Sequence, residues 1–151
     1  MTPPSTLISE PPSTEERASL LADATPAELV ALADRITAAA DVRVEAQPQV
    51  GMVVLEVREP VAGERFHLTE VLVTEARVTV DGAPGWSMRT GDDRLAALAA
   101  AVCDGAVEAG HALADDVVRL CTTTAAARAA EQAAEQARVA ATAVTFEELD
   151  R

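Results

Sequence analysis

The segment from Phe66 to Val80 constrains the fold of this chain most strongly. It is long and rich in β-branched residues, and in its second half small or apolar residues alternate with polar ones. Successive side chains of a strand point to opposite faces, so this alternation predicts a strand with one buried face. The predicted buried face consists of Leu72, Thr74, Ala76, Val78 and Val80. Glu75, Arg77 and Thr79 occupy the other face.

The segments on either side of this strand predict the rest of a small antiparallel sheet with three or four strands. They are residues 42–44, 51–57 and 86–90. A Gln47-Pro48-Gln49 sequence is expected to separate the first two, and a turn at residues 81–85 precedes the last.

Helical periodicity brackets the sheet. Residues 1–13 are rich in Pro, Ser and Thr and are predicted to form a disordered tail, and helical spacing begins near Thr14. The sequence Thr25-Pro26-Ala27-Glu28 resembles a helix cap and predicts a helix over about residues 26–39. After the sheet, Asp93 is predicted to cap another helix, which Gly105 and Gly110 weaken or end.

An alanine-rich segment is predicted to extend the chain as a helical arm over residues 122–151. A short helical piece around Val117 comes first, and residues 125–141 then have high helix propensity. The alanine face of the arm offers little side-chain area, which favours close approach to a partner element. Its alanines are Ala126, Ala130, Ala133, Ala137 and Ala140. The predicted partner anchors near its end are Val144, Phe146 and Leu149.

Together these elements predict one α+β domain over residues 14–151. Its small antiparallel sheet has N-terminal helices before it and C-terminal helices after it, and the last helix is the alanine-rich arm. A chain of 151 residues is large enough for one core of this kind.

Charge and composition exclude several function classes. Acidic residues outnumber basic ones 25 to 12, and a net charge of −13 disfavours binding to nucleic acid or to an anionic membrane. Lysine is absent, which excludes a Walker-type phosphate lysine and a Schiff-base lysine. No apolar stretch reaches the ~20 residues of a membrane helix, and the N-terminus lacks a signal-peptide pattern, so a cytoplasmic location is expected.

The cysteines and histidines predict no metal site. Cys103 and Cys121 are expected to be buried thiols in a reducing compartment. Neither His67 nor His111 has further ligand-type residues at a recognisable spacing.

Four polar residues are candidate contacts for phosphate or for another subunit. Arg65 and Arg77 have the bidentate geometry that phosphate accepts. Alternatively, Arg65 forms a salt bridge in a loop and Arg77 faces solvent beside Glu75. Glu70 and Thr74 lie four residues apart and share one strand face, which either contacts a ligand or subunit or is simply solvated.

One ordered series of residues resembles a known protein family. It runs from Gly63-Glu64-Arg65-Phe66-His67-Leu68 into the long strand, then through Gly85-Trp86-Ser87 to Gly91-Asp92-Asp93. Further matching positions in the following helix are Ala97, Ala101 and Asp104. In this order and spacing, the residues resemble the G-subunit (PhnG) family of the bacterial carbon–phosphorus lyase system.

The resemblance implies a hetero-oligomeric transferase subunit in phosphonate catabolism. Its partners would be the H, I and J subunits of the core complex and an accessory L subunit. That system transfers a triphosphoribosyl group from ATP to an alkylphosphonate and releases adenine, giving ribose 1-methylphosphonate 5-triphosphate. The family places base displacement chiefly on the I subunit.

This chain is therefore expected to be mainly structural, inactive alone and without a cofactor of its own, since ATP is a substrate of the complex. No catalytic residue is assigned to it. The rival interpretation is a stand-alone, homo-oligomeric small-molecule binding or regulatory module that uses the sheet face around Glu70 and Arg77.

Overall fold

A computed structural model describes residues 11–142 as four helices and one three-stranded sheet, which confirms the predicted α+β class. The elements are α1 (Thr14–Asp23), α2 (Pro26–Thr37), β1 (Val42–Arg58), β2 (Arg65–Val80), β3 (Ala83–Thr90), α3 (Arg94–Glu108) and α4 (Ala114–Ala141). The strands are antiparallel in the order β1-β2-β3. No helix among the described residues is long and apolar enough to cross a membrane.

The first strand is longer than the sequence predicted. Residues 42–58 form one strand paired with β2, so the predicted break at Gln47-Pro48-Gln49 is wrong. The register shifts between Val44 and Gln49 instead. Pro48 has no N–H to donate, but β1 is an edge strand, where an irregularity can accommodate proline without ending the strand.

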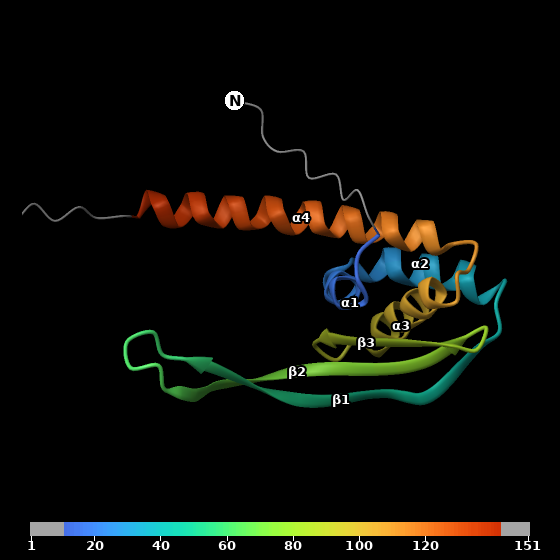
Figure 1. The fold of residues 1–151 in the computed structure, drawn as a ribbon, viewed down its shortest axis with the longest axis horizontal. Helices are drawn as coiled ribbons and strands as arrows, with labels where there is room; N and C mark the ends of the chain where they lie inside the picture. Colours follow the sequence, from blue (N-terminus) through green and yellow to red (C-terminus); the bar gives the residue numbers. More distant parts are fainter. Residues whose placement is uncertain (1–10, 143–151) are drawn as a thin grey trace, which may run out of the picture.

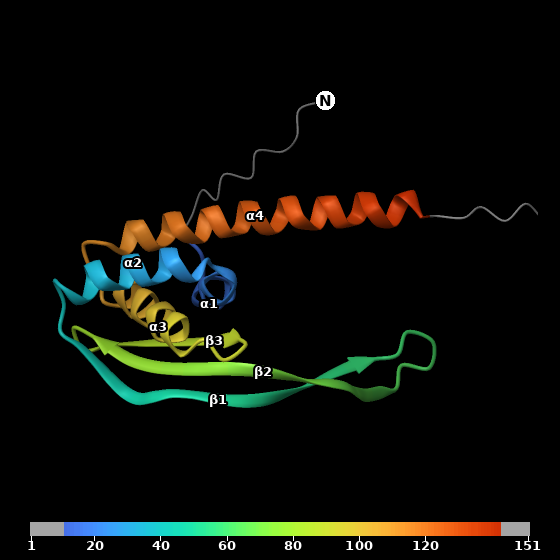
Figure 2. The same cartoon turned by 180° about the vertical axis from the view of Figure 1, so that it is seen from behind.

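Helices cover one face of the sheet and α4 lies over those helices (Figures 1 and 2). Both α1 and α3 contact the sheet and also contact α4, so they form a helical layer between the sheet and α4. The buried face of β2 consists of Thr74, Ala76, Val78 and Val80, as predicted. Leu72 belongs to the same face but is 42% exposed, because it lies beyond the last β2–β3 pair, Val73 with Thr90.

The helix predictions hold with two corrections at glycine and cap positions. Asp93 caps α3 by accepting a hydrogen bond from the Ala96 N–H at 2.9 Å, as predicted. Thr25 is the N-cap residue of α2, but its side chain makes no capping hydrogen bond. Gly105 does not end α3; the helix passes through it to Glu108, and Gly110 follows the helix with a φ of +63°.

Gly105 is required because α3 lies very close to the sheet. A Cβ at Gly105 would approach Val80 Cγ2 to 2.7 Å, and one at Gly85 would approach the Ala101 carbonyl oxygen to 2.2 Å. Neither separation is possible for real atoms, so these two glycines allow helix and strand backbones to touch.

The last helix is continuous, whereas the sequence predicted a short piece followed by a separate arm. One helix spans Ala114–Ala141. Its first half is anchored by Val117, Leu120, Cys121 and Thr124, which are buried. From Ala126 onward nearly every residue is exposed. The predicted anchors Val144, Phe146 and Leu149 lie outside the described residues, as do residues 1–10 of the tail predicted over residues 1–13. Ser13, the last residue of that predicted tail, is the N-cap of α1.

Both cysteines are buried and free, as predicted. Burial raises the pKa of Cys103 to about 12 and that of Cys121 to about 11, so neither thiol ionises near neutral pH.

Candidate functional site

The most unusual surface is a β-hairpin that projects beyond α1, α2 and α3, called here the projecting hairpin (residues 51–72). β3 ends opposite Val73, so from Leu72 outward β2 pairs only with β1. Figure 1 shows this two-stranded ribbon extending away from the helical layer. Its two strands therefore have free edges as well as free faces.

The projecting hairpin is apolar on both faces. Met52 pairs with Leu72 on the face that continues the helix-covered side of the sheet, whereas Val53 pairs with Val71 on the opposite, outer face. Seven large apolar residues of the hairpin are between 42% and 58% exposed: Met52, Val53, Val54, Leu55, Phe66, Leu68 and Leu72. A run such as Met52–Leu55 is typical of strands buried on both faces, and exposed apolar residues gathered in one region are typical of surfaces that contact another protein.

The tip of the hairpin carries two arginines directly opposite one another. Arg65 is paired in register with Arg58. Glu56 accepts a hydrogen bond from Arg65 Nη1 at 3.3 Å and lies 3.7 Å from His67 Nε2. Within residues 11–142, Arg58 forms no ion pair. Like charges in direct register are unfavourable unless an anion joins them, so this pair is a candidate anion contact. The sequence alone did not single out Arg58, because only the strand register reveals the pairing.

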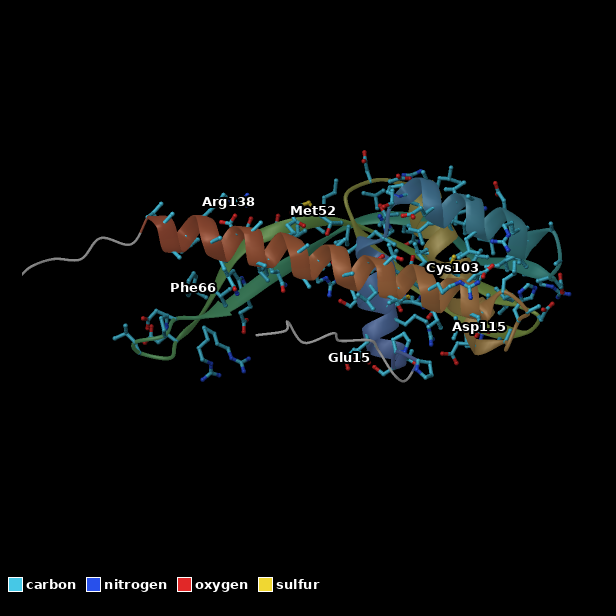
Figure 3. All side chains as sticks on the ribbon, turned by 90° about the horizontal axis from the view of Figure 1, so that it is seen from above. Glu15, Met52, Phe66, Cys103, Asp115 and Arg138 are labelled. Carbon is cyan, nitrogen blue, oxygen red and sulfur yellow. The ribbon has the colours of Figure 1, made fainter. Side chains whose placement is uncertain are left out.

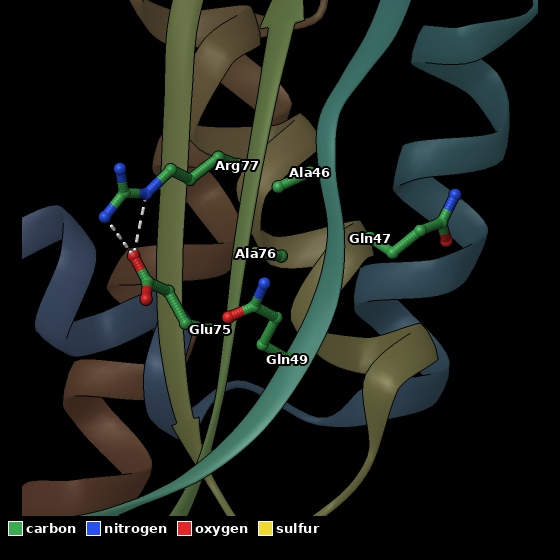
Figure 4. A pocket seen from close by; sticks show the side chains of 6 residues that line it. All are labelled: Ala46, Gln47, Gln49, Glu75, Ala76 and Arg77. Atoms are coloured by element: carbon green, nitrogen blue, oxygen red, sulfur yellow. Dashed lines mark hydrogen bonds and ion pairs between the residues drawn. The ribbon is translucent and has the colours of Figure 1, made fainter.

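Arg77 lies on the outer face of the sheet, away from the hairpin tip. Glu75 accepts hydrogen bonds from Arg77 Nε at 2.8 Å and from Trp86 Nε1 at 3.0 Å (the Arg77 contact is drawn in Figure 4). The Trp86 hydrogen bond, and then that of Arg77, lower the pKa of Glu75. A cavity of about 230 Å³ lies beside them, lined by Ala46, Gln47, Gln49, Glu75, Ala76 and Arg77. The Arg77 side chain is 64% exposed, so its ion pair adds little stability.

The other two candidates share a strand face but have different surroundings. Thr74 is fully buried and donates a hydrogen bond to the Gly91 carbonyl at 2.7 Å, which fixes the turn before α3. Glu70 is exposed on the projecting hairpin opposite Val54. Thus Arg65, Arg77 and Thr74 lie at the hairpin tip, on the outer face and in the core respectively, and do not form one site.

Sequence reasoning missed a buried ion network around Arg17. Arg17 is 4% exposed; its Nε donates to Asp104 Oδ1 at 2.7 Å and its Nη2 bonds Glu108. The second Asp104 oxygen accepts from the Trp86 backbone N–H at 3.0 Å. Burial lowers the pKa of Arg17, but the hydrogen bonds to both carboxylates outweigh this and raise the pKa overall. The network joins α1, α3 and β3, so its role is structural.

In the part of the chain that the structure describes, no three His, Cys, Asp or Glu side chains gather in a way that could hold a metal ion. The surface features that could contact another molecule are the exposed apolar residues of the projecting hairpin and the two arginines at its tip. A model of the family described as phosphonate metabolism protein PhnG matches residues 14–151. The match begins at the first residue of α1 and spans every helix and strand described above.

Proposed function

The chain belongs to the PhnG family of phosphonate metabolism proteins, and we propose that it is a mainly structural subunit of a complex that transfers a triphosphoribosyl group from ATP to an alkylphosphonate. Adenine leaves in this reaction, and with methylphosphonate the product is ribose 1-methylphosphonate 5-triphosphate. The proposed partners are the H, I and J subunits of the carbon–phosphorus lyase core complex and the accessory L subunit.

The observation that carries this proposal is the apolar projecting hairpin. Met52, Val54 and Leu72 are exposed on one face, and Val53 and Leu55 on the other. A ribbon with this composition is a hazard for aggregation when left bare in water, whereas a partner that covers it converts the same area into binding energy. An assembly role accounts for the surface directly.

The placement of the polar residues favours a structural role for this chain over a catalytic one. Arg77 is paired with Glu75, and Thr74 is buried in a structural hydrogen bond. Arg65 lies opposite Arg58 at the hairpin tip, where it pairs with Glu56. A nucleophile and its base must lie within hydrogen-bond reach of one another. We propose that the groups that displace adenine lie on a partner and that Arg65 contacts a phosphate or an interfacial carboxylate.

Co-purification tests the proposal. The tagged chain of 151 residues is co-expressed with H, I and J homologues, and the eluate is resolved by size-exclusion chromatography with light scattering. The expected result is one hetero-oligomeric peak that contains all four chains. Elution of this chain only as a homo-oligomer, while the other subunits elute elsewhere, would favour the stand-alone binding module.

Arg65→Ala is expected to weaken assembly or turnover of the complex by about 1.5–3 kcal/mol, the range for a charge-assisted hydrogen bond, or roughly 10- to 150-fold. Titration calorimetry and single-turnover rates measure the two effects. Arg43→Ala is the matched control, because Arg43 is an exposed arginine in the same strand pair whose only ion pair among the described residues is with nearby Asp41. Equal behaviour of both variants would reduce Arg65 to a surface charge.

A further inference from the structure

The helical layer between the sheet and α4 is missing at one end of the molecule. At the root of the sheet, meaning its three-stranded part where β2 pairs with β3, α1 and α3 fill the layer between the sheet and α4. Beyond them, the projecting hairpin and the outer half of α4 continue toward the same side of the molecule (Figures 1 and 2). Residues of both are exposed, so neither packs on the other and no described element takes the place of α1 and α3 between them.

The hairpin side of this interval is mostly apolar and includes the carboxylate of Glu70. Met52, Val54, Glu70 and Leu72 continue the face of the sheet that α3 covers nearer the root, because the register is unbroken from Thr74 to Glu70. Figure 3, which views the molecule from the α4 side, shows Met52 beyond the edge of that helix. Met52 is 58% exposed. Within residues 11–142, Glu70 has no ion-pair partner.

The α4 side of the interval is polar and carries another free carboxylate. Residues three and four apart share a helix face, so the buried row of Val117, Cys121 and Thr124 continues through Arg128, Glu131 and Glu135. Arg128 forms an ion pair with Asp23, and Glu135 forms one with Arg138. Among the described residues, no cation pairs with Glu131. The alanine face of the arm lies on the opposite side of the helix, so it does not line this interval.

We propose that this interval receives an amphipathic helix from a partner subunit, which would replace the missing layer. Its apolar stripe would lie on Met52, Val54 and Leu72, and basic side chains would reach Glu70 and Glu131. A helix fits because helices fill the same layer between the sheet and α4 nearer the root. A second copy of this chain is disfavoured as the occupant, because two chains of net charge −13 repel one another.

The proposal rests on the proposed function, and its test separates the two. The same four-chain co-purification is repeated with Leu72→Asp and with Glu131→Arg. Each variant is expected to lower the amount of co-purified partner at least tenfold. Leu95→Asp and Glu45→Arg are the controls, because they make the same changes at exposed positions outside the interval and are expected to assemble like the wild type. Circular dichroism and thermal melting of each purified variant exclude loss of folding as the cause.

If the wild-type chain fails to assemble, the proposed function is wrong. If it assembles and both interval variants assemble equally well, the interval is not the docking site. A photo-crosslinking amino acid in place of Met52 identifies which protein segment occupies the interval. We expect crosslinks to a helical, arginine- or lysine-bearing segment of a partner subunit. Crosslinks to another copy of this chain alone would overturn the choice of occupant.

Discussion

Replacing Arg17 with alanine is expected to lower the free energy of unfolding by about 3–5 kcal/mol, the range for breaking a buried ion pair by removing one partner. The Arg17 side chain is 4% exposed, and its guanidinium pairs with both Asp104 and Glu108. Its loss leaves Asp104 buried as an uncompensated charge. Asp104 also accepts a hydrogen bond from the Trp86 backbone N–H, so α1, α3 and β3 would all be affected. Urea denaturation followed by circular dichroism measures the change.

The matched control is Arg43→Ala. Arg43 pairs with Asp41 in a contact where both side chains are well exposed, so its loss should change stability by less than about 1 kcal/mol. The alternative variant Arg17→Met keeps most of the packing of the aliphatic side chain and should still be strongly destabilised, because the carboxylates remain unpaired. If Arg17→Met is as stable as the wild type, the network is not needed for folding.

Gly85→Ala is expected to destabilise the fold by about 3 kcal/mol, at the upper end for overpacking. The new Cβ would lie 2.2 Å from the Ala101 carbonyl oxygen and 2.7 Å from the Gly105 backbone nitrogen. These atoms belong to the backbone of α3 and cannot rotate away, so the helix must move off the sheet. Thermal unfolding measured by differential scanning calorimetry should show a clear fall in Tm.

Gly51→Ala provides the comparison within the same sheet. A Cβ at Gly51 meets nothing within 4 Å, and its backbone does not have a positive φ. We expect a change within about 1 kcal/mol, in either direction. Equal destabilisation by the two substitutions would show that glycine flexibility, and not the close approach of α3 to β3, explains Gly85.

Local patterns predicted the elements whose environment is uniform along their length. The alternation from Thr74 to Val80 identified a buried face correctly, and the sequence Thr25-Pro26-Ala27-Glu28 located the start of α2. Pro48 was misleading because an edge strand tolerates proline, and edge position is a property of the whole sheet. The two parts of α4 looked distinct because only the first half packs against the domain, although the backbone is helical throughout.

The functional surface was less predictable because it depends on where other elements end. Leu72 and Val78 lie on the same face of β2, and only the end of β3 and of the helical layer leaves the first exposed and the second buried. Arg17 looks like a surface residue until the fold brings Asp104, 87 positions later in the chain, within 2.7 Å. Such contacts between distant segments carry no local sequence signal.

Release of adenine from ATP in the presence of methylphosphonate tests the central claim most directly. Three mixtures are compared: the H, I and L homologues with this chain, the same homologues without it, and this chain by itself. The account predicts rapid adenine release only when this chain joins the other subunits, and none from the chain by itself. Turnover by the isolated chain that a point mutation in it abolishes, or full activity of the other subunits without it, would contradict the assignment of a structural subunit.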